Sequence, residues 1–154
     1  MSDQPARVLF VCLGNSCRSQ MAEGFARALG AGVVVPASAG LSPAMGVAAD
    51  TIRAMEEKNI SLRDHFPKSV RNLSRIRFDI VVNMCQRQLP PMLGNNRPLR
   101  IVEWEIPDPI GFSYQEHCQV RDEIERKVAA LIEEIRQQAP PPQFRGQGSG
   151  YVPL

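Results

Sequence analysis

The sequence predicts an α/β domain built on a parallel β-sheet. Short apolar runs of strand length alternate along the chain with longer stretches of helical period, giving a β-α-β-α-β-α-β-α pattern. The connections are short, and right-handed crossovers would place the strands in one parallel sheet covered by helices on both faces. The 154 residues suit one domain with a sizeable core.

The first half of the chain is expected to contribute two strands and two helices. An apolar run over residues 7–11 predicts a buried strand, and residues 19–29 predict a helix. A second strand is expected over residues 33–40. It is followed by residues 47–58, in which apolar residues recur at helical spacing, and by a short helix over residues 69–73.

The second half repeats the alternation. Residues 78–84 and 99–102 predict strands, and a short helix between them over residues 86–93 would be interrupted by two prolines. A proline-containing loop over residues 104–111 leads into a long amphipathic helix over residues 114–138.

Composition sets the boundaries of the domain and the class of protein. Residues 1–138 are predicted to form the domain, and the Pro/Gly-rich residues 139–154 a flexible tail. The net charge of +2, without a dense Lys/Arg cluster, argues against nucleic acid as a partner. No signal-peptide core and no apolar run of membrane-spanning length occur, so we expect a cytoplasmic protein that does not engage a membrane. Separately, we expect a monomer.

The segment between the first strand and the first helix carries the chemistry. It consists of small and polar residues, so its N–H groups and the helix N-terminus can converge on one concavity that suits an oxyanion. No Gly-Lys-Ser/Thr follows, which excludes the nucleotide-binding phosphate loop. The residues expected to bind the oxyanion are Leu13, Gly14, Asn15, Ser16, Cys17 and Arg18.

Three residues of this segment have expected catalytic roles. Cys12 is the candidate nucleophile, because a helix N-terminus and a neighbouring cation favour the reactive thiolate. Arg18 offers a planar fork that matches two oxygens of a tetrahedral anion. Ser19 could cap the helix and donate to the Cys12 sulfur. A Cys-x5-Arg spacing alone could arise by chance, but its coincidence with a strand end and a helix start favours a site.

The sequence CLGNSCRSQMAEG, residues 12–24, resembles the signature of low-molecular-weight protein tyrosine phosphatases. It is more similar still to the thiol-dependent arsenate reductases of that superfamily, since the phosphatases usually have proline where this chain has Gln20. The resemblance covers about residues 7–137. It implies a flavodoxin-like, three-layer fold with strand order 2-1-3-4. The cysteine spacings do not resemble a structural zinc site, and we expect no bound cofactor or metal.

Asp108 is the candidate general acid. Two flanking prolines fix the backbone around its carboxylate, although Asp-Pro also occurs in ordinary turns. In the phosphatases, tyrosine commonly follows this Asp-Pro pair. Here Ile110 and Gly111 follow, which is closer to the Asp-Pro-Ala-Gly pattern of the reductases.

Cys85, at the carboxyl end of the third strand, is the candidate second thiol. The resemblance implies this role, since the thioredoxin-coupled reductases have cysteine near this point and the phosphatases usually have aspartate. An inert, buried cysteine is the alternative. The third cysteine of the thioredoxin-coupled relay is missing from the following residues, so Cys118, Cys17 or an external thiol could resolve the intermediate. Cys17 could instead pair with Cys12 as a protective lock.

Further residues are expected to brace the loop. The resemblance implies that Ser38 lies beside Asn15, and that His65 holds its own loop through hydrogen bonds. Lys68 stands where potassium-binding reductases have an acidic residue, so its ammonium could occupy that site and pair with Glu23. An ordinary exposed lysine is the alternative.

These residues predict arsenate reduction through a Cys12–arsenate adduct that a second thiol resolves. The expected reductant is an external thiol such as thioredoxin, glutathione or mycothiol, so a redoxin is a possible partner besides the small oxyanion substrate. The alternative is a phosphotyrosine phosphatase that works through a phosphocysteine at Cys12. A third class, a non-enzymatic oxyanion-binding module, is disfavoured because Cys12, Arg18 and Asp108 occur together.

Overall fold

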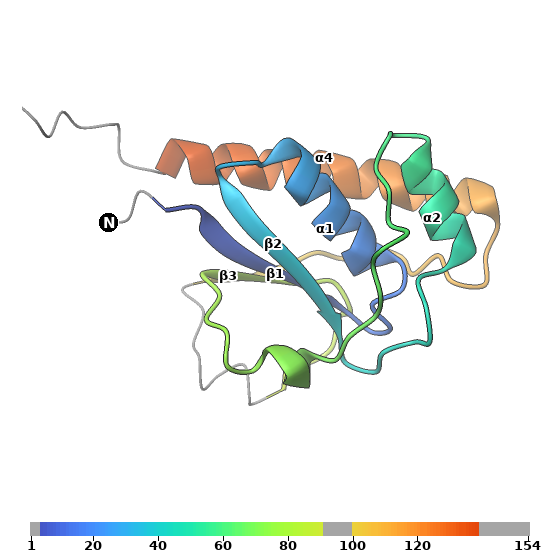
Figure 1. Cartoon of the computed structure of the whole chain (residues 1–154), viewed down its shortest axis with the longest axis horizontal. Helices are drawn as coiled ribbons and strands as arrows, with labels where there is room; N and C mark the ends of the chain where they lie inside the picture. Colours follow the sequence, from blue (N-terminus) through green and yellow to red (C-terminus); the bar gives the residue numbers. More distant parts are fainter. Residues whose placement is uncertain (1–3, 91–99, 139–154) are drawn as a thin grey trace, which may run out of the picture.

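A computed structural model describes residues 4–90 and 100–138 of the chain. Strands and helices alternate along it as predicted, with bounds that differ by a few residues from those expected (Figure 1). The elements are β1 (Ala6–Cys12), α1 (Arg18–Leu29), β2 (Val34–Gly40), α2 (Ala49–Glu56), the 3-10 helix η1 (Val70–Leu73), β3 (Ile80–Asn83), β4 (Arg100–Glu103) and α4 (Tyr114–Gln138).

All four strands form one parallel sheet in the order β2-β1-β3-β4, which confirms the predicted sheet and strand order. The register pairs Cys12 with Gly40 and Val11 with Asn83. The carboxyl ends of β1, β2 and β3 therefore meet at one edge of the sheet. In open α/β sheets this edge faces the ligand.

The central strand β1 is buried on both faces, so its apolar side chains alternate between two cores. Val8 and Phe10 join the larger core under α1, α2 and α4. Leu9 and Val11 join a smaller core, which η1 and the segment around Phe78 cover. The three α-helices thus lie on one face, and the 3-10 helix η1 lies on the other (Figure 1).

Two expectations for other segments have different outcomes. The short helix expected over residues 86–93 is wrong for residues 86–90, which are bends and irregular chain, and residues 91–93 lie outside the described part. Gln86 has a positive φ of 56°, which is incompatible with a helix starting directly after Cys85. The predicted tail, residues 139–154, also lies outside the described residues, so the domain boundary stays a prediction.

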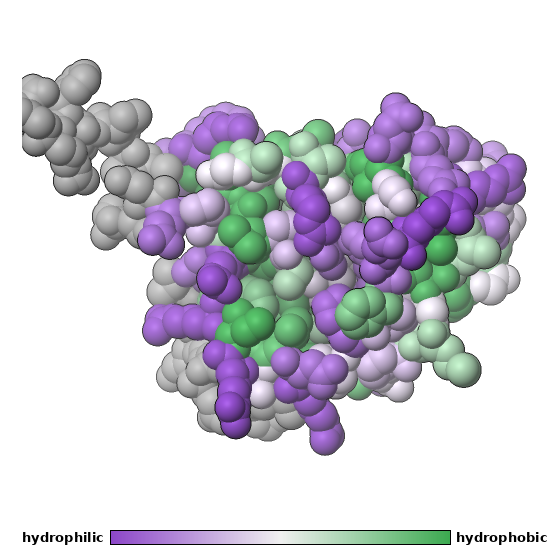
Figure 2. Space-filling view, in the orientation of Figure 1, coloured by the Kyte–Doolittle hydropathy of each residue, from purple (hydrophilic) through white to green (hydrophobic). Residues whose placement is uncertain are grey.

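The surface that faces the viewer in Figure 2 is largely hydrophilic, with a strip of hydrophobic side chains where Figure 1 draws β1 and β2. β2 is an edge strand with the half-exposed Val35, and Pro36 removes one N–H from it. An edge without that donor is a poor template for pairing with another strand. Within residues 4–90 and 100–138, no helix is both long and apolar enough to cross a bilayer.

Candidate active site

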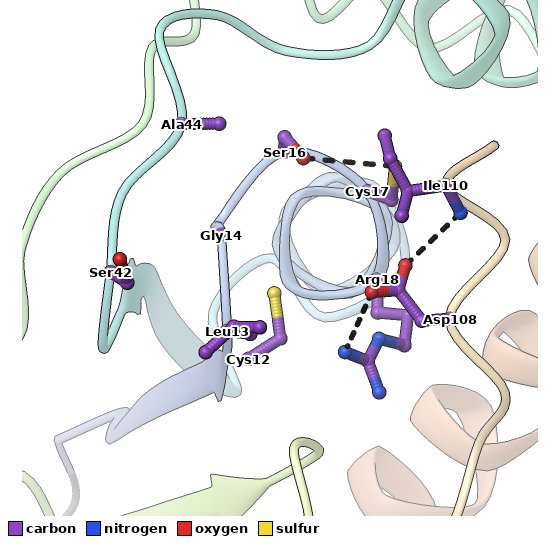
Figure 3. A pocket seen from close by; sticks show the side chains of 10 residues that line it. All are labelled: Cys12, Leu13, Gly14, Ser16, Cys17, Arg18, Ser42, Ala44, Asp108 and Ile110. Atoms are coloured by element: carbon purple, nitrogen blue, oxygen red, sulfur yellow. Dashed lines mark hydrogen bonds and ion pairs between the residues drawn. The ribbon is translucent and has the colours of Figure 1, made fainter.

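A cavity of about 270 Å³ opens at the carboxyl end of β1. The loop between β1 and α1 forms one side of it, and the segment around Asp108 forms the opposite side (Figure 3). The structure therefore brings together residues that are almost a hundred positions apart in the sequence. The lining residues are Cys12, Leu13, Gly14, Ser16, Cys17, Arg18, Ser42, Ala44, Asp108 and Ile110.

The carbonyl groups of the loop point away from the cavity. Those of Cys12, Leu13, Gly14 and Ser16 accept hydrogen bonds of 2.8–3.1 Å from backbone amides in residues 41–48. The carbonyl of Asn15, the remaining residue of this run, accepts from the Gln20 side chain at 3.1 Å instead. All of the loop's carbonyls from residue 12 to residue 16 thus have outward partners.

The N–H groups of the same loop consequently point into the cavity. In a trans peptide the carbonyl of one residue and the N–H of the next point in opposite directions. The peptide bonds of this loop are trans. Within the described part of the chain, the N–H groups of residues 13–17 have no hydrogen-bond acceptor. They form a concave set of donors for an anion, to which the N-terminus of α1 adds partial positive charge.

Cys12 lies at the base of these donors with only 2% of its surface exposed. Its sulfur lies 2.9 Å from the Ser19 hydroxyl oxygen, and Asn15 Nδ2 donates to that same oxygen at 2.7 Å. The Asn15 contact leaves the Ser19 hydrogen available to the sulfur, as expected for a thiolate partner. The expected capping role of Ser19 is wrong, because α1 begins at Arg18 and the Ser19 side chain is turned toward Cys12 instead.

Asn15 fixes the conformation of the loop through its backbone and its side chain. It is fully buried and adopts a positive φ of 52°, a conformation that asparagine tolerates better than most residues. Its Oδ1 accepts from the Lys68 backbone N–H at 3.0 Å and from Gln20 Nε2 at 3.2 Å. Gln20 Oε1 in turn accepts from His65 Nδ1 at 2.8 Å, which places the hydrogen of the imidazole on Nδ1.

The remaining bracing residues are arranged differently from the expectation. Glu23 accepts from the Ser38 hydroxyl at 2.5 Å and pairs with Arg27 at 2.7 Å. The Lys68 ammonium lies 5.3 Å from the centroid of the Phe66 ring. Among the described residues no ion pair joins Lys68 to Glu23, so that expected pairing is wrong. Lys68 braces the loop through its backbone, and the Ser38 hydroxyl donates to Glu23.

Arg18 is buried beneath the mouth of the cavity, with 6% of its surface exposed. Its Nη1 donates to the carbonyls of Met84 at 2.6 Å and Ile106 at 3.1 Å, which fixes the plane of the guanidinium. Its Nε is buried without a hydrogen-bond partner among the described residues. A buried donor of this kind has a desolvation cost that an anion in the cavity would offset.

Asp108 faces Arg18 from the opposite wall (Figure 3). Its Oδ2 lies 3.4 Å from Arg18 Nη2, and its Oδ1 accepts from the Ile110 N–H at 3.1 Å. The side chain of Asp108 is 38% exposed, so a proton can reach it from solvent. The carboxylate is thus held at the mouth, where an oxygen leaving a bound anion would emerge.

The structure contains two further thiols close to Cys12. Cys17 lines the cavity, and burial raises the pKa of its thiol although hydrogen bonds from Thr51 and Ser16 oppose the shift. Cys85 follows β3, the neighbour of β1, and burial raises the pKa of its thiol also. All four cysteines are reduced, and Cys118 lies on α4 beside Arg121.

The chain matches the family model described as low molecular weight phosphotyrosine protein phosphatase over residues 7–140. This match spans the loop, Arg18 and Asp108. The chain belongs to this family. The recognition drawn from residues 12–24 is thereby confirmed.

Among its relatives in the family is the glutaredoxin arsenate reductase of Synechocystis sp., which is 36% identical over 84% of this chain and 98% of that protein. Arsenate reductase 1 of Staphylococcus epidermidis is 34% identical over 86% of this chain and 99% of that protein. A solved structure described as an arsenate reductase in the phosphate binding state superposes with a TM-score of 0.77 at 36% identity, covering 84% of this chain and 98% of that one.

Two features of this family member were not expected from the sequence. Gln20 was noted only as a difference from the phosphatase signature, yet it is fully buried and joins Asn15, His65 and Phe66. Thr51, which contacts Cys17, stood in a helix with no evident link to the loop. The contacts of Gln20 with His65 and Phe66, and of Thr51 with Cys17, join residues that are far apart in the sequence, so no local pattern predicts them. Within the described residues, no three His, Cys, Asp or Glu side chains are placed to hold a metal ion.

Proposed function

We propose that this protein is an arsenate reductase. In the first step the Cys12 thiolate attacks the arsenic of a bound arsenate. The loop N–H groups and Arg18 hold its remaining oxygens, and Asp108 protonates the oxygen that leaves. The unpartnered Nε of buried Arg18, beside a cavity lined by inward N–H groups, supports this anion-binding step, which arsenate and phosphate would share. The free thiol of Cys85 after the strand next to Cys12 is the observation that carries reduction.

In the second step Cys85 attacks the sulfur of the Cys12–arsenic adduct. A disulfide forms between the two cysteines, and arsenite leaves with the electron pair of the broken bond. Cys85 follows the carboxyl end of β3, the strand next to β1, and is close enough to Cys12 for the two groups to interact electrostatically, which supports this assignment. An external thiol such as thioredoxin, glutathione or mycothiol then reduces the disulfide. The names of the relatives support arsenate as the substrate.

The test is arsenate-dependent consumption of each external thiol by wild type, Cys12→Ser and Cys85→Ser. We expect turnover in wild type, none in Cys12→Ser, and a loss of at least about 10²-fold in Cys85→Ser, because a nucleophile is removed from the second step. Cys118→Ser is the matched control and should retain activity, since Cys118 lies on α4 away from the cavity lining. An equally active Cys85→Ser variant would overturn the second step.

Phosphotyrosine hydrolysis is the second candidate, favoured by the family's own description. Its first step would use the same groups, with water in place of the second thiol. We expect weak hydrolysis of small aryl phosphates that requires Cys12 and not Cys85. Hydrolysis of phosphotyrosine peptides that outpaces arsenate reduction would favour the phosphatase instead.

A further inference from the structure

Asn83, the last residue of β3, holds the turn that carries Cys85. Its Oδ1 accepts from the Cys85 backbone N–H at 3.2 Å and from the Cys85 thiol at 3.1 Å. Its Nδ2 donates to the Arg87 carbonyl at 2.8 Å and lies 3.4 Å from a Glu103 carboxylate oxygen. One buried amide, 3% exposed, therefore ties both ends of the turn together.

The turn needs such a tie because it is locally unfavourable. Gln86, directly after Cys85, has a φ of 56°, a region that glutamine rarely occupies. Conformations of this kind persist only where surrounding contacts determine them. The clip made by Asn83 spans this residue, from Cys85 on one side to Arg87 on the other, and so fixes the direction of the Cys85 side chain.

The chemistry of an amide gives the clip a second effect. An amide oxygen accepts a hydrogen bond but is too weak a base to remove the thiol proton, so its contact favours the neutral thiol. The charged and titratable groups that face Cys85 are Cys12 and Arg18, and Glu103 faces the Asn83 amide. Burial, the largest influence, acts in the same direction as the amide and raises the pKa of the Cys85 thiol, although a hydrogen bond from the Arg87 backbone and the charge of Arg18 oppose the shift.

We propose that Asn83 is a positioning residue that keeps the resting Cys85 thiol protonated and aligned with the sulfur of the Cys12 adduct, so that Cys85 gives up its proton only as its sulfur attacks. This inference rests on the proposed function for its catalytic meaning. It assigns a task to a residue that does not line the cavity.

The step it serves is balanced without a further reactant. The Cys85 sulfur bonds to the Cys12 sulfur, and the bond between Cys12 and arsenic breaks with its electron pair on arsenic. Two thiol sulfurs are oxidised to a disulfide, and arsenic(V) is reduced to arsenic(III). The proton of Cys85 ends on an oxygen of the departing arsenite.

The first experiment is a single turnover with arsenate and no external reductant, followed by acid quench and mass spectrometry of the Cys12–Cys85 disulfide. We expect Asn83→Ala to slow disulfide formation by roughly 10- to 100-fold, the scale on which misplaced groups lower a rate. Hydrolysis of a small aryl phosphate, which requires Cys12 but not Cys85, should stay within about twofold of wild type. Glu103→Gln, which keeps an acceptor for Asn83 Nδ2, is the matched control and should behave as wild type.

The second experiment needs no arsenate and separates positioning from mere stabilisation. Alkylation of Cys85 by iodoacetamide is followed against pH, with the Cys118 peptide as internal reference. Loss of the amide oxygen in Asn83→Ala should move the Cys85 midpoint to lower pH. A carboxylate in Asn83→Asp should move it to higher pH, because negative charge disfavours the thiolate.

The outcomes distinguish this inference from the proposed function. If wild type forms no Cys12–Cys85 disulfide with arsenate, the proposed second step fails, while opposite pH shifts in the two variants would still establish the clip. If wild type forms the disulfide but Asn83→Ala forms it equally fast, or both variants alkylate as wild type does, the role of Asn83 is overturned. Thermal unfolding identifies a variant that has lost its fold, in which case the other variant decides.

Discussion

Arg18 combines structural and binding functions within one side chain. Its Nη1 is committed to two backbone carbonyls, from Met84 and Ile106, which join the end of β3 to the segment that carries Asp108. Its Nε is left for a ligand. A guanidinium can do both because its donors are fixed in one plane and point in different directions, whereas an ammonium is a single point of charge.

Arg18→Lys is therefore expected to fold but to lose most of its activity. Loss of one preorganised donor to a reacting oxyanion typically lowers the rate by about 10²–10³-fold, and we expect a decrease in kcat/KM for arsenate of that size. Arg27→Lys, on the exposed part of the same helix and paired with Glu23, is the control and should change little. Equal losses in the two variants would contradict a specific role for Arg18.

At the scale of elements, the loop's shape depends on strand β2 and the residues that follow it. Amides of residues 41–48 bind the outward carbonyls of the loop, and Gly40 packs directly against it. A Cβ on Gly40 would lie 2.7 Å from the Leu13 carbonyl oxygen and 3.0 Å from the Asn15 nitrogen. Because both are backbone atoms, the loop itself would have to shift.

Gly40→Ala should lower the free energy of unfolding by about 1–3 kcal/mol, the usual cost of overpacking. It should also weaken phosphate binding, measured by calorimetry, because the donors no longer converge. Gly46→Ala is the matched control, since a Cβ there meets nothing within 4 Å. Phosphate affinity that is unchanged in Gly40→Ala would show that the loop tolerates the shift.

For the molecule as a whole, the larger core is the foundation of the site. Helix α4 packs on α1 and α2, and Ile124 lies fully buried among them and the sheet. The strand ends that carry Cys12 and Cys85 rest on the same sheet. A substitution at Ile124 should nevertheless lower the stability of the core without changing the geometry of the site, because Ile124 does not line the cavity.

Ile124→Ala should cost about 2–5 kcal/mol of unfolding free energy, the range for removing large aliphatic side chains from a core. Val35→Ala, at a half-exposed position of the edge strand, should stay within about 0.5 kcal/mol of wild type. Urea titrations give both values. Under conditions in which Ile124→Ala remains folded, its kcat should match that of wild type. A lower kcat would show that packing of the core affects the geometry of the active site.

The sequence was informative where chemistry and periodicity are local. The strand that ends at Cys12, the loop after it and the long C-terminal helix follow from runs of neighbouring residues. Contacts between distant segments could not be predicted in the same way. The sequence predicts that Lys68 acts through its charge, but Lys68 acts through its N–H. Of the two roles predicted for Ser19, the contact with Cys12 is present and the helix cap is not. In both cases tertiary packing decided which polar group was available.

The unpartnered nitrogen of Arg18 has a consequence for selectivity inside a cell. Phosphate and arsenate share shape and charge, so both would relieve that nitrogen, and abundant phosphate should compete for the empty enzyme and raise its melting temperature by mass action. The enzyme then has to discriminate arsenate from phosphate after binding, in the chemical step. Sulfur can transfer two electrons to arsenic(V) but not to phosphorus(V), so the competitor occupies the cavity without ever consuming the second thiol.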